Sequence, residues 1–278
     1  MRVAFQGEPG AYSEQAVFAY FGQVDTQPCE TFDAVFDAVA SHSCDSALIP
    51  IENSLAGSIH QNYDLLLRHS VHIVGEHLLR VRHCLIAFPG VEKADIRRVI
   101  SHPQALGQCA EYLRALGVKA EPAYDTAGSV KILKTTGDRS MAAVASQRAA
   151  EIYGMQILEE GIEDNPENYT RFLAVQRDSV LPAGEAKTSI VFTLKNQPGA
   201  LFKALSVFAL RDIDLTKIES RPLAGKPWEY LFYIDFIGAT DQERVRKALD
   251  HLNEYALMLR VLGSYARDKG TNLSASSD

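Results

Sequence analysis

The residues best suited to chemistry lie at the start of one predicted strand. Asn168, Thr170, Arg171 and Phe172 follow a polar loop and begin an apolar run that ends at Gln176. An arginine can pair with a carboxylate through two hydrogen bonds, a threonine hydroxyl can donate one, and a phenylalanine can form an apolar wall. The same residue types also suit an ordinary strand with its arginine in solvent, and composition alone slightly favours that ordinary strand.

Small polar residues also stand where several predicted strands end. Ser13, Ser54, His102 and Thr126 each open a predicted helix. Helix N-termini carry N–H groups and a partial positive charge, so several of them around one cleft would bind a dicarboxylate without many basic side chains. Because such caps are common in proteins that bind nothing, each one taken singly indicates structure rather than function.

The whole-chain composition limits the classes of partner. With 278 residues the chain is longer than most single cores, which favours two domains. Lys and Arg number 28 against 35 Asp and Glu, and the net charge of -7 argues against a nucleic-acid or anionic-membrane surface. A small anionic substrate would therefore need a local positive site.

The sequence contains no targeting or metal-binding pattern. The N-terminus turns at Gly7, before any apolar stretch long enough for a signal peptide, and no segment approaches about eighteen consecutive apolar residues. The four cysteines form no CxxC pair, which fits reduced thiols in the cytosol, and the eight histidines show no metal-ligand spacing. We expect a cytoplasmic protein without a metal site.

The elements that must position these residues form an α/β domain over residues 1–178. Short apolar runs alternate with helical patterns, which indicates a largely parallel sheet. Two sets of these strand–helix units are joined by a long alternating segment that crosses between them near 75–85. The chain returns near 156–172. This predicts a two-lobed fold like that of type 2 periplasmic binding proteins, whose cleft holds small ligands. The predicted strands are 2–6, 46–51, 99–101, 119–123, 141–145, 156–158 and 171–176, and the predicted helices are 13–21, 32–39, 59–67, 103–116, 126–133 and 146–153.

A second, smaller domain is predicted over residues 188–265, after a linker at 179–187 that contains Pro182 and Gly184. Its pattern reads strand 188–194, helix 200–210, strands 214–219 and 229–237, helix 242–253 and strand 258–265. This βαββαβ order is that of a ferredoxin-like fold. The tail at 266–278 is expected to be disordered.

Several segments resemble one enzyme family. Thr170–Phe172 resembles the TRF motif of prephenate dehydratases, and Pro50–Ser54 resembles that family's PIENS segment. Agreement extends to Gly10–Ser13, His102–Leu106 and Ala143–Ala150, and it covers essentially residues 1–178 in order. The family lacks a metal or redox cofactor, because the reaction is driven by formation of an aromatic ring. The resemblance implies loss of the ring hydroxyl and of carbon dioxide from prephenate, giving phenylpyruvate for phenylalanine biosynthesis.

The second domain resembles an ACT domain. Its GALX turn and its ESRP segment are matched here by Gly199, Ala200, Leu201, Phe202 and by Glu219, Ser220, Arg221, Pro222. In relatives these two segments form a phenylalanine site at a subunit interface. The resemblance implies feedback regulation by L-phenylalanine in a homodimer or homotetramer.

The resemblance also implies roles for single residues. It places Thr170 at the ring hydroxyl, where we expect it to donate a hydrogen bond and to relay a proton. We assign polar contacts with the substrate to Ser13, Asn53, Ser54 and Thr126. Arg171 is expected to pair with a substrate carboxylate, and Phe172 is expected to form an apolar wall. Glu52 is a second candidate for the acid, although its place after Pro50 and Ile51 favours a structural hydrogen bond.

The sequence leaves three other functions open. An arogenate dehydratase would use the same machinery on a substrate with an amino group. A non-catalytic protein of the same fold would keep the cleft without needing Thr170, and a pure amino-acid sensor would keep only the second domain's site. The intact Thr170–Phe172 segment and the missing secretion signal count against the last two. The chain begins directly with a strand, so no chorismate mutase activity is expected.

Overall fold

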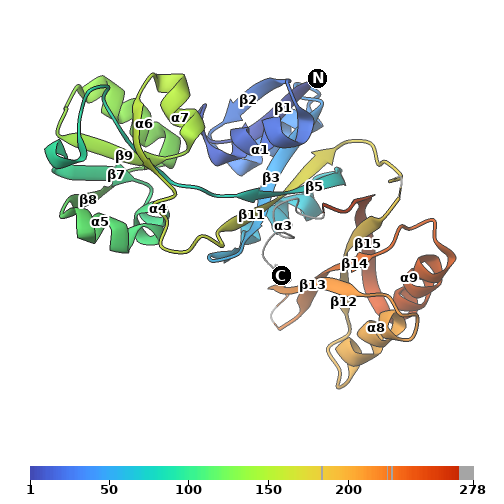
Figure 1. Cartoon of the computed structure of the whole chain (residues 1–278). Helices are drawn as coiled ribbons and strands as arrows, with labels where there is room; N and C mark the ends of the chain where they lie inside the picture. Colours follow the sequence, from blue (N-terminus) through green and yellow to red (C-terminus); the bar gives the residue numbers. More distant parts are fainter. Residues whose placement is uncertain (183, 224, 227, 269–278) are drawn as a thin grey trace. The chain divides into compact units, whose positions relative to one another are not determined.

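The computed structural model describes residues 1–182, 184–223, 225–226 and 228–268 (Figure 1). The chain divides into two compact units. Unit 1 comprises Met1–Leu65 and His77–Phe172, and unit 2 comprises Leu66–Glu76 together with the chain from Leu173 onward. Residues 269–278 of the tail predicted to be disordered lie outside the described residues; Ala266 ends the last strand of unit 2.

The first sheet of unit 1 is built around β1 (Arg2–Gln6). This strand runs parallel to β2 (Asp25–Cys29) and β3 (Ser46–Asn53), and the short β4 (Gly57–Ser58) pairs with β3 in the antiparallel sense. The accompanying helices are α1 (Tyr12–Phe21), α2 (Phe32–Ala40) and α3 (His60–Arg68). The hydroxyl of Thr31 accepts a hydrogen bond from Ala34 N at 3.2 Å, so Thr31 caps the N-terminus of α2.

The second sheet of unit 1 has the strand order β10-β6-β9-β7-β8. These strands are β6 (Cys84–Ala87), β7 (Arg98–Ser101), β8 (Lys119–Pro122), β9 (Met141–Ala145) and β10 (Gln156–Glu160). The central pairs β7/β8 and β7/β9 are parallel, whereas β6 runs antiparallel to both β9 and β10.

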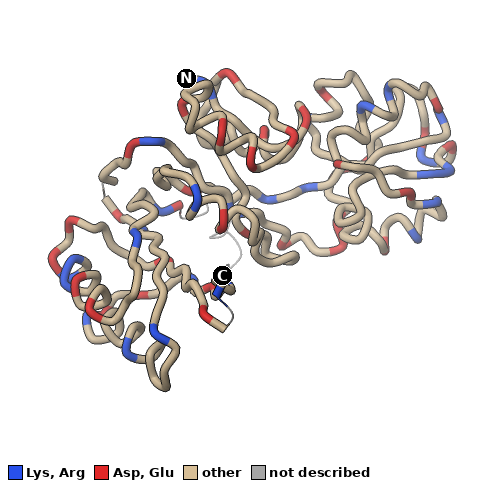
Figure 2. Tube along the Cα trace, turned by 180° about the vertical axis from the view of Figure 1, so that it is seen from behind, with Lys and Arg blue, Asp and Glu red and all other residues tan. Residues whose placement is uncertain are grey.

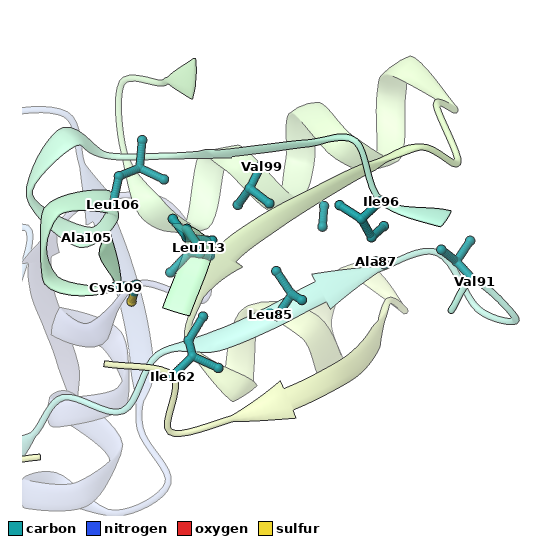
Figure 3. Packing of buried hydrophobic residues seen from close by; sticks show 12 residues of the cluster. Leu85, Ala87, Val91, Ile96, Val99, Ala105, Leu106, Cys109, Leu113 and Ile162 are labelled. Atoms are coloured by element: carbon teal, nitrogen blue, oxygen red, sulfur yellow. The ribbon is translucent and has the colours of Figure 1, made fainter. Parts of the chain in front are cut away.

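Helices cover both faces of this second sheet (Figure 1). On one face α4 (Pro103–Gln108) and α5 (Ala110–Leu116) bring Leu106 and Leu113 against Leu85 and Val99, which Figure 3 shows converging on one core. On the other face α6 (Thr126–Thr136) and α7 (Gln147–Tyr153) pack against the alternate strand residues. The single helix predicted over 103–116 is wrong, because the backbone leaves helical geometry at Cys109 (φ -119°, ψ 22°).

Gly10 joins the two parts of unit 1. Its φ of +92° favours glycine, and a Cβ there would stand 2.8 Å from the Cα of Ala149. Next to it the Ser146 hydroxyl donates a hydrogen bond to the carbonyl of Gly10 at 2.6 Å. Two of the segments that carry the family resemblance therefore meet in space.

Unit 2 contains the predicted βαββαβ arrangement, which the structure confirms. The elements are β12 (Ala186–Leu194), α8 (Ala200–Ala209), β13 (Leu215–Pro222), β14 (Tyr230–Ile237), α9 (Glu243–Tyr255) and β15 (Ala256–Ala266). The strand order is β13-β14-β12-β15, and all three pairs are antiparallel. Val207 and Phe208 of α8 and Val245 and Leu252 of α9 share one core with the sheet, so both helices cover the same face.

The segment 66–76, which the sequence assigns to the first domain, is held within unit 2. The Arg260 guanidinium donates to the carbonyls of Leu67 and His69 at 2.9 Å each. The Lys187 ammonium lies 2.7 Å from a carboxylate oxygen of Glu76. This segment runs into β5 (His72–Arg80), and β11 (Tyr169–Gln176) likewise continues from unit 1 into unit 2.

Charged residues of both signs occur in each unit, as Figure 2 shows along the Cα trace. Within the part of the chain that the structure describes, no helix combines the length and apolar character needed to cross a membrane.

Candidate active site

Unit 1 contains a pocket with a volume of about 200 Å³. Six of the residues singled out from the sequence line it: Ser13, Asn53, His102, Thr126, Thr170 and Phe172. The described lining residues do not include Ser54 or Arg171.

Strand geometry explains why Arg171 is left out. Thr170 and Phe172 both line the pocket from β11, and successive side chains of a strand point to opposite faces. Arg171 therefore leaves the strand on the other side. We withdraw its assignment to a substrate carboxylate in this pocket.

Ser54 has a structural position instead. Its hydroxyl donates to the carbonyl of Glu167 at 2.7 Å and accepts from Tyr169 N at 2.9 Å. These bonds tie the turn after β3 to the start of β11. The contact predicted between Ser54 and the substrate lacks support in this geometry.

Three of the four predicted helix caps are wrong. The N-cap of α1 is Ala11 rather than Ser13, and the N-cap of α6 is Asp125, whose carboxylate accepts from Gly128 N. Ser54 precedes the short β4 rather than a helix. Only His102 caps as predicted, with its ring nitrogen accepting from Gln104 N at 3.2 Å. A polar residue that follows a strand can be the N-cap of the next helix or a residue of its first turn, and its position in the sequence does not distinguish the two.

Asn53 connects several parts of the pocket. Its Oδ1 accepts hydrogen bonds from the backbone N–H groups of Leu55 and Ala56, at 3.1 and 2.9 Å. Its Nδ2 donates to Thr170 Oγ1 at 3.0 Å and to Asn168 Oδ1 at 2.8 Å. Since the Thr170 oxygen accepts from Asn53, the hydroxyl hydrogen of Thr170 is left to donate elsewhere.

A line of polar side chains continues from Asn168. Asn168 Nδ2 donates to Gln108 Oε1 at 3.1 Å, and that oxygen also lies 2.9 Å from His83 Nε2. The other ring nitrogen of His83 lies 2.8 Å from the Tyr12 hydroxyl. The sequence named Asn168 among the residues suited to chemistry, but it did not single out Gln108, His83 or Tyr12 for the site, although Tyr12 belongs to a segment quoted for the resemblance.

Burial controls the ionisation of this end of the pocket. The ring of His83 is almost fully buried, and burial lowers its pKa below the ordinary value, opposed by the Gln108 hydrogen bond and the charge of Glu163. Burial also raises the pKa of Tyr12 well above its ordinary value. Both side chains are thus kept neutral near pH 7.

The pocket can bind an anion through neutral groups. It reaches the N-terminal ends of α1 and α6 through Ser13 and Thr126, where N–H groups and the helix dipole favour negative charge. Another part of the lining is apolar and includes Pro50, Ile59, Val81, Ala105 and Phe172. In the described part of the chain, no three His, Cys, Asp or Glu side chains gather as a group that could hold a metal ion.

The segments predicted to bind phenylalanine lie in unit 2. Gly199 is the N-cap of α8 with φ +79°, and Ala200 and Leu201 line a second pocket of about 130 Å³ together with Tyr230. Glu219, Ser220, Arg221 and Pro222 lie on β13, paired with Tyr233, Phe232, Leu231 and Tyr230 of β14. Within one chain, residues of both segments thus lie near Tyr230 of β14.

An α/β unit with a polar pocket, followed by a small ferredoxin-like unit, defines the class of a ligand-regulated metabolic enzyme. The family profile of prephenate dehydratase matches residues 3–180, and that of the ACT domain matches residues 188–253. The chain belongs to the prephenate dehydratase family. It is therefore a dehydratase, a carbon–oxygen lyase.

Individual relatives agree with this result. Arogenate dehydratase/prephenate dehydratase 2 of Arabidopsis thaliana, named as chloroplastic, is 52% identical over 96% of this chain and 73% of its own length. The crystal structure of prephenate dehydratase from Arthrobacter aurescens in complex with L-Phe is 34% identical, with a TM-score of 0.88 over 96% of this chain and 90% of that one. A structure described as a novel type of quorum-quenching acylase, GqqA, is 37% identical, with a TM-score of 0.91 over 97% and 99% of the two chains.

Proposed function

We propose that this enzyme converts prephenate to phenylpyruvate, water and carbon dioxide in phenylalanine biosynthesis, with Thr170 acting on the departing hydroxyl. One observation carries the assignment of Thr170. In a chain of this family, the Thr170 oxygen lies on the pocket wall and accepts from Asn53 at 3.0 Å, which leaves its hydrogen to donate.

The reaction breaks two bonds of the substrate. The C–C bond to the ring carboxylate gives its electron pair to the ring, and the C–O bond on the opposite side of the ring breaks with its pair on oxygen. The departing oxygen takes up one proton and leaves as water, while the carboxylate leaves as carbon dioxide. Thr170 donates a hydrogen bond to that oxygen as negative charge develops on it; such help contributes about a hundred- to ten-thousandfold when a full proton transfer follows.

The two parts of the wall suit the two carboxylates of prephenate. The side-chain carboxylate is held at the N-terminal ends of α1 and α6, beside Ser13 and Thr126. The ring carboxylate faces the apolar part that includes Phe172 and Val81. Poor solvation there favours loss of its charge as carbon dioxide.

The pocket also bears on the choice between prephenate and arogenate. Arogenate has an ammonium group where prephenate has a keto oxygen, and a buried ammonium needs an anionic or carbonyl partner. The described residues that line the pocket include no Asp or Glu. This favours prephenate, although the names of several plant relatives include arogenate.

We assign phenylalanine binding to paired second domains, near Gly199–Phe202 and Glu219–Pro222, in a homodimer or homotetramer. Leu201 lines a pocket in unit 2, and Ile218, Trp228 and Tyr230 are exposed apolar side chains near the two segments. A second copy would cover such surface. Cytoplasmic location stays a prediction for this chain.

The test is turnover of prephenate and, separately, of arogenate by purified protein, with and without added phenylalanine. Conversion of prephenate that phenylalanine suppresses is expected. A Thr170→Ser variant should stay active and Thr170→Ala should not; an active Thr170→Ala variant removes Thr170 from the mechanism. Leu201 and Glu219 variants as sensitive to phenylalanine as the parent would remove the regulatory assignment.

A second candidate function is amide hydrolysis, favoured by the similarity to the quorum-quenching acylase. A hydroxyl nucleophile needs a nearby base. Both ring nitrogens of His83 are already engaged, with Tyr12 and with Gln108. An acyl-amide substrate should therefore be tested separately under the same conditions. Its cleavage, without turnover of prephenate, would make amide hydrolysis the assigned function in place of prephenate dehydration.

A further inference from the structure

A buried carboxylate lies at the end of α1 to which the substrate is assigned. Glu14 belongs to the first turn of this helix, and its side chain is 5% exposed. Ser13, the residue before it, lines the pocket. A negative charge at the N-terminal end of a helix offsets the partial positive charge of the free N–H groups. An unpaired Glu14 carboxylate would therefore weaken the binding of an anion there.

Three groups donate hydrogen bonds to the Glu14 carboxylate. Its Oε2 accepts from Gly10 N at 2.8 Å, and its Oε1 accepts from Thr26 Oγ1 at 3.1 Å. Arg148 Nε also donates to Oε2, at 2.9 Å. Of these three donors, Arg148 alone is charged. The two neutral donors hold the carboxylate in place, whereas Arg148 also compensates its charge.

Arg148 reaches Glu14 from the other part of unit 1. It lies on α7, which packs against the second sheet, and its guanidinium carbon stands 4.3 Å from the centre of the Phe18 ring on α1. The guanidinium is thus stacked on an aromatic face beside the carboxylate. The described residues that line the pocket include neither Arg148 nor Glu14. Both charges therefore act on a bound anion through space rather than by contact.

We propose that Arg148 is a positioning residue that sets the affinity for the anionic substrate by compensating the charge of Glu14. This rests on the proposed function, in which the side-chain carboxylate of prephenate lies at the N-terminal end of α1. A helix with its side chains is about 10–12 Å wide, so two charges at the same end of α1 lie about 10 Å apart or less. At an effective dielectric constant of about 20–40, their repulsion weakens binding about five- to twentyfold.

Glu14→Gln removes the charge and keeps the hydrogen bonds. Gly10 N and Arg148 Nε can only donate, so they hold the amide oxygen of the new side chain on their side. Its NH2 group then faces the Thr26 hydroxyl, which can turn to accept. In the double variant Glu14→Gln/Arg148→Met both charges are absent, and the amide still bonds to Gly10 and Thr26.

The measurements are KM and kcat for prephenate and the inhibition constant of phenylpyruvate, which retains the side-chain carboxylate. Arg148→Met should raise KM and the inhibition constant about five- to twentyfold, with kcat within about threefold of the parent. The double variant should return both constants to within about twofold of the parent, because no unpaired charge is left. Loss of packing on Phe18 would not be rescued in this way.

Lys131→Met is the matched control. Lys131 on α6 lies 3.1 Å from a carboxylate oxygen of Glu8, and the two side chains are 54% and 42% exposed. The variant removes the same formal charge as Arg148→Met, but water solvates the Glu8 carboxylate that remains. We expect KM and the inhibition constant to stay within about twofold of the parent.

Other results would overturn the proposal. A double variant as impaired as Arg148→Met would mean that Arg148 acts by packing on Phe18. Unchanged constants in Arg148→Met would mean that the Glu14 charge does not reach the substrate. Equal rises in Arg148→Met and Lys131→Met would mean that the net charge of the chain, rather than this pair, sets the affinity.

Glu14→Gln decides the question if thermal unfolding shows that Arg148→Met is not folded. The unpaired Arg148 cation should then attract the substrate and lower both constants about two- to fivefold, less than the opposite effect because this side chain is 34% exposed. Constants equal to those of the parent, or higher, would contradict the proposal. A parent that does not turn over prephenate would instead be a failure of the proposed function, visible before any variant is compared.

Discussion

Two buried groups of polar side chains, one in each unit, are built in opposite ways. The pocket of unit 1 uses neutral amides and an imidazole, each engaged with two or more partners, from Asn53 to His83. In unit 2, Glu76 and Lys187 instead form a buried ion pair and are 3% and 9% exposed. An amide has a donor end and an acceptor end, so its hydrogen bonds fix the orientation of the neighbouring side chain. The attraction in an ion pair depends mainly on distance and fixes orientation much less. The first arrangement suits an active site and the second suits a permanent joint.

The largest expected effect lies in that joint, at Gly263 of β15. A Cβ built there would stand 2.0 Å from the backbone carbonyl oxygen of Ile73, which cannot move aside without disturbing the segment that carries Glu76. We expect Gly263→Ala to lower the free energy of unfolding by about 4 kcal/mol or more. Denaturant unfolding measures it.

Gly107 offers the matched control, because a Cβ there would meet no heavy atom within 4 Å. Gly107→Ala should change the free energy of unfolding by no more than about 1 kcal/mol, in the stabilising direction expected within a helix. Equal effects of the two alanines would mean that the close approach at Gly263 does not hold in solution.

The next effect concerns the ion pair itself. Lys187→Met leaves the Glu76 carboxylate buried without its cation, which should cost about 3–5 kcal/mol of unfolding free energy. Glu76→Leu added to Lys187→Met should recover much of that loss, because two apolar groups of similar size need no partner. A double variant as unstable as the single one would show that Glu76 is held by something other than Lys187.

The neutral line of unit 1 should be more tolerant. Asn168→Ala removes one member and leaves the NH2 group of Asn53 and the oxygen of Gln108 each with one partner fewer. We expect a loss of about 1–3 kcal/mol in unfolding free energy, smaller than that of Lys187→Met measured in the same denaturant. A larger loss than at Lys187 would reverse the comparison between the two units.

The fold could be predicted wherever burial leaves a pattern in the sequence. Strands such as Met141–Ala145, buried along their whole length, and the alternation of elements in unit 2 were found in this way. β2 was missed, because Asp25, Thr26, Gln27 and Pro28 have polar or strand-breaking side chains and the strand is held by backbone pairing with β1. The break at Cys109 likewise depends on how α4 and α5 pack.

The candidate site was predictable only in part, for a related reason. Thr170 and Asn53 stand in short segments that resemble family motifs. His83 and Gln108 have no local pattern, and nothing near Asn168 indicates its bond to Gln108, since these bonds join residues 25 and 60 positions apart. The Glu76–Lys187 pair spans 111 positions and was equally invisible. Such contacts exist only once the chain has folded.

The smallest effect is a difference in pH dependence at His83. Burial lowers the pKa of this histidine below its ordinary value of 6.5, so the unfolded chain binds a proton that the folded one resists. The stability that depends on a neutral His83 is fully present above pH 6.5 and is lost as the pH falls from 6.5 toward the lower folded value. His83→Gln has no such group and should lose less stability than the parent between pH 7.5 and pH 5. Denaturant unfolding of both proteins at the two values measures it, and parallel losses would mean that the buried ring accepts its proton without cost, for instance by turning the Tyr12 hydroxyl toward the Arg82 carbonyl.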